Sequence, residues 1–171
     1  ARLAEAQRAT QTLMEALPNP IFFKDTGGRY LGVNRAWEAY FGIPRQSFVG
    51  KTVHELYPHD AALAQRLHEM DEALWRNPGT QTHETTITLP DGSEREAIYC
   101  KATFTDAAGR VAGLIGTIID VTESRQLERR YRDIFEQAAV GIVQVGLDGA
   151  LSGANQRFCE MLGYRSEELI G

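Results

Sequence analysis

Apolar positions recur at helical spacing in three separate stretches of the chain. In each stretch the steps alternate between three and four residues, which places the side chains on one face of an α-helix. The three sets are Leu3, Ala6, Thr10, Leu13 and Leu17; Leu63, Leu67, Met70 and Leu74; and Leu127, Tyr131, Ile134 and Ala138. We expect the first helix to end at Pro18, the second to begin at Asp60 and end at Asn77, and the third to be a solvated connector.

Strand-like runs occupy the segments between these helices. Each run is rich in β-branched or aromatic residues and is bounded by turn residues. The five runs are Ile21–Phe23, Tyr30–Val33, Thr82–Leu89, Glu94–Phe104 and Val111–Val121. Short turns join the first pair and the last three, as in the hairpins of an antiparallel sheet. Because the intervening helices must cover one face of that sheet, the pattern predicts an α+β domain.

Two short helices are expected between the second strand and the long helix. Asn34 is a good N-cap for a helix over Arg35–Phe41, and Gly42 suits the position after its end. A second short helix is expected near Arg45–Val49, and it would end at Gly50.

The chain begins to repeat itself at an offset of 121 residues. Leu13–Gly50 aligns without a gap on Ile134–Gly171. The identical pairs are Glu15/Glu136, Ile21/Ile142, Gly28/Gly149, Gly32/Gly153, Asn34/Asn155, Gly42/Gly163 and Gly50/Gly171. Most of these are Gly or Asn, the residues that mark turns and helix ends. The repeat therefore predicts one complete module followed by the opening of a second.

Composition and charge narrow the classes of partner. The net charge of −5 gives no electrostatic reason to expect nucleic acid or an anionic membrane as a partner. No apolar run approaches the roughly 18 residues of a membrane span. Cys100 and Cys159 are far apart, which favours a reducing, cytoplasmic setting. Because residue 1 is not Met, we expect a piece of a longer protein, whose other parts could hold a membrane segment or an effector.

Catalysis within these residues is not expected. The four histidines lack the spacing of a metal site on one helix. Ser47 and Ser93 lie at turns or helix starts, where a structural hydroxyl is the expected role. Gly27-Gly28 lacks the glycine spacing of a phosphate-binding loop and indicates a hairpin turn. The sequence therefore predicts a domain that is not an enzyme by itself, with room for an attached kinase or cyclase elsewhere in the protein.

Three groups of residues, taken together, resemble a known family. The groups are Asn19–Asp25 with Gly28–Asn34 and Tyr40–Gly42; Leu89–Ser93; and Asp106, Gly109–Val111, Gly113 and Gly116 with the closing run Asp120–Glu123. Their order and spacing resemble the PAS sensor domains. The resemblance covers about residues 18–123, and again about 139–171.

The resemblance implies a five-stranded antiparallel sheet with helices over one face and an internal cavity between them. It divides the chain into an amphipathic helix over 1–17, a complete PAS domain over 18–123, a helical connector over 124–138 and the truncated start of a second PAS domain over 139–171. PAS domains usually occur in tandem upstream of a histidine kinase, a diguanylate cyclase or a similar output. They commonly dimerise through flanking helices. We therefore expect a homodimer with a downstream effector in the same polypeptide.

The cofactor of such a domain stays unknown from the sequence. Some PAS sensors hold haem through a histidine on the long helix, but His68 lies at the border of the apolar face of that helix. Light-sensing relatives use a reactive Cys, which is absent from residues 43–80, and a Gln where this chain has Ile118. Flavin–thiol photochemistry is therefore disfavoured. A non-covalent flavin or haem in a redox sensor stays open, as does a domain without any cofactor.

A small ligand in the cavity would meet apolar and aromatic side chains. The first candidates for ligand binding are Trp37, Phe41, Tyr99 and Ile118. Each of them is also a natural core residue. An anionic ligand would look to Lys101 or Arg66, both of which we expect to be solvated.

Signal transmission is expected at the end of the last strand. Asp120 and Thr122 lie where that strand passes into the connector helix. Thr122 can cap the helix, and Asp120 can hold a basic side chain or a backbone donor. A change in strand position would then tilt or rotate the helix. Two other interpretations are a plain helix cap, and a ligand-free interaction module that sets dimer geometry.

Overall fold

The computed structural model describes residues 2–170, which fall into two compact units divided between Val121 and Thr122. The side chains of residues 2–4, 6 and 7 are outside the described part, so the expected seam positions Leu3 and Ala6 lie there too. Within residues 2–170, no helix is both long and apolar enough to cross a lipid bilayer.

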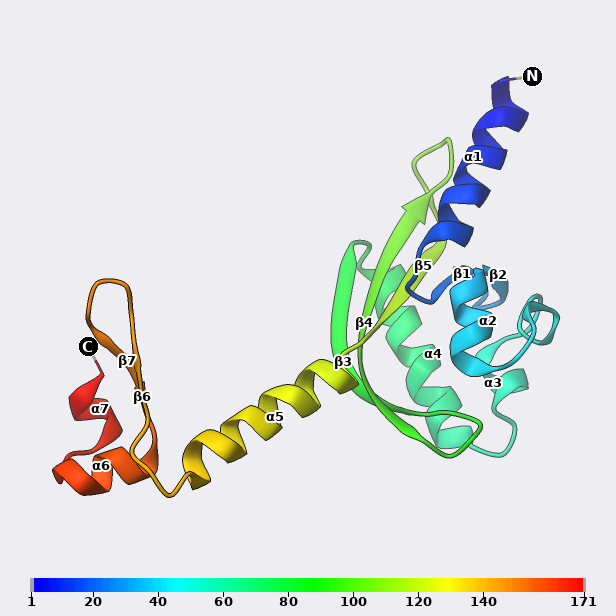
Figure 1. Cartoon of the computed structure of the whole chain (residues 1–171). Coiled ribbons are helices and arrows are strands. Elements are labelled where there is room, and N and C mark those ends of the chain that lie inside the picture. The colour runs from blue at the N-terminus through cyan, green and yellow to red at the C-terminus, as the bar shows by residue number, and fades with distance from the viewer. Residues whose placement is uncertain (1, 171) are drawn as a thin grey trace. The chain divides into compact units, whose positions relative to one another are not determined.

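A five-stranded antiparallel sheet forms the base of the first unit (Figure 1). Its strands are β1 (Ile21–Asp25), β2 (Tyr30–Val33), β3 (Thr80–Thr88), β4 (Glu94–Thr105) and β5 (Val111–Asp120). They lie in the order β2-β1-β5-β4-β3. Three hairpins join neighbours in sequence, and one long-range pairing, of β1 with β5, closes the sheet. The predicted α+β class and five-stranded antiparallel sheet are confirmed.

Helices cover one face of this sheet (Figure 1). The covering elements are α2 (Arg35–Phe41), the 3-10 turn η1 (Arg45–Ser47), α3 (Val53–Leu56) and α4 (Ala61–Arg76), whereas α1 (Arg2–Ala16) precedes the sheet and extends away from it. The helix expected near Arg45–Val49 is only the short turn η1. Helix α3 was not expected; it forms because Thr52 and Glu55 make a capping box around its first turn.

The predicted helix ends are present. The Asn34 side chain accepts a hydrogen bond from the Trp37 amide at the start of α2, and Gly42 ends that helix at φ 66°. Only glycine adopts this left-handed conformation without strain. Asp60 accepts a hydrogen bond from the Leu63 amide and so caps α4.

Aromatic rings fill the centre of the core between the sheet and α2. The rings are those of Phe22, Tyr30, Trp37, Phe41 and Phe48, with neighbouring centroids 4.6 to 6.2 Å apart. Gly116 on β5 makes room for the Phe22 ring, because a Cβ at residue 116 would lie 2.3 Å from it. This packing fixes β1, β5 and α2 against one another.

The second unit repeats the opening of the first. It contains α5 (Thr122–Gln137), β6 (Val143–Val145), β7 (Leu151–Ala154), α6 (Gln156–Leu162) and α7 (Ser166–Leu169). The two strands form an antiparallel hairpin. Asn155 caps α6 and Gly163 ends it in the left-handed conformation, as Asn34 and Gly42 do for α2. Large apolar side chains such as Leu147, Met161 and Tyr164 are exposed.

Candidate functional site

The principal candidate site is a cavity of about 990 Å³ between the helices and strands β3 and β4, here called the helix-side cavity. Its apolar wall is formed by Phe41, Ile43, Phe48, Leu56, Leu63, Leu67, Met70, Ile87 and Leu89. Polar residues form the rest of the wall, and they include the cations Lys51 and Arg66, the carboxylates of Glu55, Asp60 and Glu84, and the rings of Tyr57, His83 and Tyr99. An enclosed wall with both apolar surface and polar groups is suited to a small molecule.

The four residues predicted to bind a ligand are divided between this cavity and the core. Phe41 and Tyr99 line the helix-side cavity. Trp37 and Ile118 are fully packed in the aromatic and aliphatic core, and are not among the described lining residues. A direct ligand contact therefore stays a prediction for Phe41 and Tyr99, whereas Trp37 and Ile118 have positions suited to support.

Two ring systems stack at one end of the cavity. His83 on β3 and Tyr99 on β4 face each other across the strand pair, with ring centroids 5.2 Å apart and planes 11° from parallel. The His83 Nδ1 atom is buried and finds no hydrogen-bond partner within the described chain. Burial lowers the pKa of His83, and so do the positive charges of Lys101 and Arg66, whereas the Asp71 carboxylate opposes them in part. Burial also raises the pKa of Tyr99 far above its ordinary value.

Beside this end of the cavity lies a buried group of three charges, here called the ion triad. Lys24 Nζ on β1 is 2.6 Å from Asp71 Oδ2, and Lys101 Nζ on β4 is 2.5 Å from Asp71 Oδ1. The exposed fractions of Lys24, Asp71 and Lys101 are 2%, 1% and 4%. Asp71 on α4 therefore ties the helix to strands on both sides of β5.

The ion triad overturns one expectation. Lys101 was expected in solvent, but it is buried, because it alternates with Ala97 and Tyr99 on the face of β4 that α4 covers. Arg66 is exposed at the cavity rim, as expected. The signal for the triad was available: Lys24 shares the inward alternation of Phe22, and Asp71 lies four residues after Leu67 on the apolar face of α4. A charge at such a position indicates a buried ion pair.

The helix that precedes the sheet is held by a second group of residues, here called the asparagine latch. Asn34 Oδ1 accepts hydrogen bonds from the amides of Ile21 and Trp37. Its Nδ2 donates to the carbonyls of Met14 and Asn19, at 3.0 Å each. One side chain thus joins the end of α1 to β1 and α2.

Glu15 strengthens the latch. It accepts a hydrogen bond from the Arg35 amide and forms an ion pair of 2.8 Å with Arg45. Arg45 also binds Glu38, at 2.6 Å. The hydrogen bond from Arg45 lowers the pKa of Glu15 below its ordinary value. Sequence reasoning assigned Asn34 only the cap of α2.

The second unit contains the same latch. Asn155 Oδ1 accepts from the amides of Ile142 and Phe158, while its Nδ2 donates to the carbonyls of Phe135 and Val140. Glu136 accepts from the Gln156 amide, as Glu15 does from Arg35. Both residues are identical pairs of the repeat, so the repeated sequence could have revealed that each latch holds the helix before its own domain.

Family models and known proteins identify this architecture. A model described as "PAS fold" matches residues 14–126, which is more than half of the chain, and a model described as "PAS domain" matches residues 129–171. The chain belongs to the PAS family. The family predicted from the sequence motifs is thereby confirmed.

Several relatives among curated proteins are sensor proteins. The chain is 33% identical over 132 residues to the virulence sensor protein BvgS of Bordetella pertussis, covering 75% of this chain and 10% of BvgS. It is 30% identical over 131 residues to the C4-dicarboxylate transport sensor protein DctS of Rhodobacter capsulatus, covering 77% of this chain and 20% of DctS. The chain thus spans a fifth or less of the length of these relatives.

Solved structures have the same fold. The PAS domain from Bordetella pertussis BvgS is 29% identical, with a TM-score of 0.63, covering 76% of this chain and 96% of that one. The structure described as VqmA bound to DPO is 16% identical, with a TM-score of 0.59 over 95% of this chain and 74% of that chain, and shows the shared fold only. These relationships support a PAS domain of a sensory signalling protein.

Asp120 and Thr122 lie at the predicted exit of the first PAS domain. Asp120 is the last residue of β5, and Thr122 is the first residue of α5. Burial and the Asp120 carboxylate raise the pKa of Tyr40 on α2 to about 12. This places the end of β5 close to α2, the helix that the asparagine latch anchors. A role in transmission stays a prediction for both residues.

His68 does not fit a haem ligand in this PAS domain. It lies on α4, as expected, but its ring contacts His54 and Trp75, with centroids 5.3 and 6.4 Å away. Leu63, Leu67 and Met70 line the helix-side cavity from another face of α4. The cavity histidine is instead His83, on a strand.

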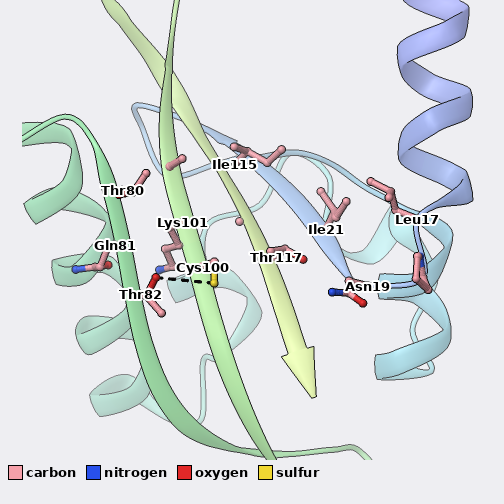
Figure 2. Close-up of a pocket in the computed structure, with 13 residues that line it drawn as sticks. Leu17, Asn19, Ile21, Thr80, Gln81, Thr82, Cys100, Lys101, Ile115 and Thr117 are labelled. Atoms are coloured by element: carbon pink, nitrogen blue, oxygen red, sulfur yellow. Dashed lines mark hydrogen bonds between the residues drawn. The ribbon is translucent and has the colours of Figure 1, made fainter. Parts of the chain in front are cut away.

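The face of the sheet opposite the helices carries an outer groove of about 670 Å³. Figure 2 shows Ile21, Ile115 and Thr117 projecting from β1 and β5 into this groove, beside Cys100 of β4 and Thr82 of β3. Leu17, at the end of α1, closes one side of it (Figure 2). The groove is mostly apolar and is continuous with the start of the latch.

Proposed function

We propose that residues 18–123 form a sensory input domain that binds a small ligand in the helix-side cavity and carries out no reaction itself. The cavity is the observation that carries this proposal: it has about 990 Å³ and is lined by apolar side chains together with polar and charged ones. Phe41 and Tyr99 are the proposed direct contacts, and Trp37 and Ile118 hold them in place from the core. Cys100 and Cys159 are free thiols, which fits the cytoplasmic setting expected from the sequence.

The ligand state would pass through the flanking helices to an effector in the same polypeptide. The conformational signal would be exchanged with α1 through the asparagine latch, because Asn34 joins α1 to both β1 and α2. It would reach α5 through Asp120 and Thr122, because they lie where β5 passes into α5. A ligand that binds one packing of the helices more tightly than another shifts the equilibrium between the two packings by its difference in affinity for them. The position of α5 would change with that equilibrium.

Native mass spectrometry of freshly purified protein tests ligand binding. We expect a mass increment that denaturation removes, and that Thr85→Trp abolishes by filling the cavity from β3. Glu94→Trp, exposed on β4 outside the cavity, is the matched control and should keep the increment. An absorption spectrum of the same sample checks the alternative of a redox cofactor. An increment that persists in Thr85→Trp would place the ligand elsewhere.

A homodimer is the second proposal, and the outer groove is the observation that favours it. The occupant we propose is α1 of a second copy. Leu13 on α1 is 68% exposed, and Leu17 directly after α1 is 49% exposed and already borders the groove. A ligand-free interaction module would need only this surface. Sedimentation velocity should report a dimer for the native chain and a monomer for Ile115→Glu in the groove. Leu31→Glu, at an exposed side chain of β2, should leave the dimer unchanged.

A further inference from the structure

The ion triad contains unequal numbers of opposite charges. Two ammonium groups, of Lys24 and Lys101, share the single carboxylate of Asp71, and all three side chains are more than 95% buried. The triad thus has one positive charge in excess when both lysines are protonated. An enclosed charge without a counter-charge is unfavourable because it has lost its hydration, and burial accordingly lowers the pKa of Lys24.

The excess charge is placed on the side of Lys101. Lys24 Nζ lies 4.5 Å from the Tyr30 ring centroid and 5.5 Å from that of Phe22, so two aromatic faces stabilise this ammonium. Lys101 is instead two residues from Tyr99, on the same face of β4. Tyr99 and its partner His83 form the adjoining wall of the helix-side cavity.

The acidic side chains that line the cavity have other partners. Glu55 binds Thr52 and Arg29, and Asp60 caps α4. Glu84 also has an interaction partner. Lys51 and Arg66 are the cations that line the cavity. Lys101 and Arg66 lower the pKa of His83, which Asp71 raises in part. Cations thus lie near the His83–Tyr99 end, where the buried His83 nitrogen lacks a partner within the described chain.

We propose that the ligand of the helix-side cavity is an apolar molecule with one carboxylate group. Its carboxylate lies at the His83–Tyr99 end, where the field of Lys101 and Arg66 is strongest, and its apolar part contacts Phe41 and Met70. This proposal rests on the proposed function, since it names the chemical class of the ligand for the same cavity. Binding would supply the negative charge that the ion triad lacks.

Matched pairs of ligands test the proposal directly. The probes are straight-chain and aromatic carboxylic acids of six to twelve carbons, each beside its primary amide, which has the same shape without the charge. Dissociation constants are measured by NMR titration of the native chain. We expect the acids to bind at least about tenfold more tightly than their amides.

Substitution of single cations then identifies which of them causes the preference for acids. Lys101→Met leaves the balanced pair Lys24–Asp71, so the fold is retained, and the preference for acids should fall to about twofold or less. Arg66→Gln should reduce it in part. Arg110→Gln, which removes the same charge in the exposed turn after β4, should leave it unchanged.

Three outcomes would overturn the proposal: equal or tighter binding of the amides, binding of none of the acids, or an undiminished preference in folded Lys101→Met. The proposed function is tested separately. A neutral molecule in the native mass spectrum, lost in Thr85→Trp, would reject the carboxylate while supporting a ligand in the cavity.

Discussion

At the scale of single residues, Asp71 is the side chain on which most of the buried charge depends. Asp71→Asn would leave Lys24 and Lys101 as neighbouring ammonium groups without a carboxylate, and should cost about 3–5 kcal/mol of unfolding free energy. Lys101→Met removes the excess charge instead, and should change stability by less than about 1 kcal/mol or raise it. Urea denaturation of the two variants measures both effects. Equal losses in the two variants would contradict the charge imbalance.

His83 should make the stability of the domain depend on pH. Burial and two nearby cations lower the pKa of His83 in the folded state, so the unfolded chain binds a proton more readily. Stability should therefore fall as the pH drops through about 6.5, and keep falling until His83 protonates in the folded state. We expect His83→Gln to lose less stability than the native chain between pH 7.5 and 5.5. His59 is exposed before α4, so His59→Gln controls for the loss of an imidazole. If the stability of His83→Gln depended on pH as strongly as that of the native chain, His83 would not be the cause of that dependence.

The partners of residues that act locally could be predicted from the sequence. For residues with distant partners, the pattern could indicate a buried charge but could not name its partner. Asn34, Gly42 and Asp60 act within three or four positions of themselves, and their caps are present. Lys24 and Lys101 are 77 positions apart, and their common partner lies on a helix between them. Alternation placed Lys101 on the inner face of β4. Only the position of α4 shows that this face is closed to water.

At the scale of elements, the hydrogen bonds by which the asparagine latch holds α1 can be tested separately from the cap of α2. Asn34→Ala removes the cap of α2 and the donors to α1 together, whereas Asn34→Asp keeps the acceptor Oδ1 and loses the Nδ2 donors. We expect Asn34→Asp to retain α2 while amide protons in the last turn of α1 exchange at least tenfold faster. Hydrogen exchange followed by mass spectrometry measures this. Exchange in α1 that is unchanged in both variants would contradict the latch.

The pairing of β1 with β5 could not be predicted from the pattern of helices, strands and turns. Each expected hairpin has a short turn, which selects the antiparallel neighbour directly. Ile21 pairs instead with Thr117, across almost the whole domain. No turn selects such a pairing; burial of Phe22 against Gly116 does, and sequence spacing carries no trace of it. The resemblance to the PAS family, rather than the pattern itself, supplied the five-stranded sheet.

At the scale of the whole molecule, α5 is attached at both of its ends. It begins where β5 of the first PAS domain stops, at Thr122, and its last turn is held by Asn155 through the Phe135 carbonyl. The helix that follows the first domain is thus also the helix that precedes the second. The same pair of latch residues, Asn and Glu, joins α1 to the first domain.

The latch of the second unit should therefore control output without affecting the sensor. Asn155→Ala in the full-length protein should leave ligand affinity of the first domain unchanged and weaken the dependence of output on ligand, because α5 loses its attachment to β6 and α6. Thr122→Ala should act in the same direction from the other end of α5. Glu160→Gln, exposed on α6, is the matched control. Dose–response curves of output, measured beside ligand affinity, separate the two effects: a lower affinity with unchanged coupling would mean that Asn155 stabilises its domain and transmits nothing.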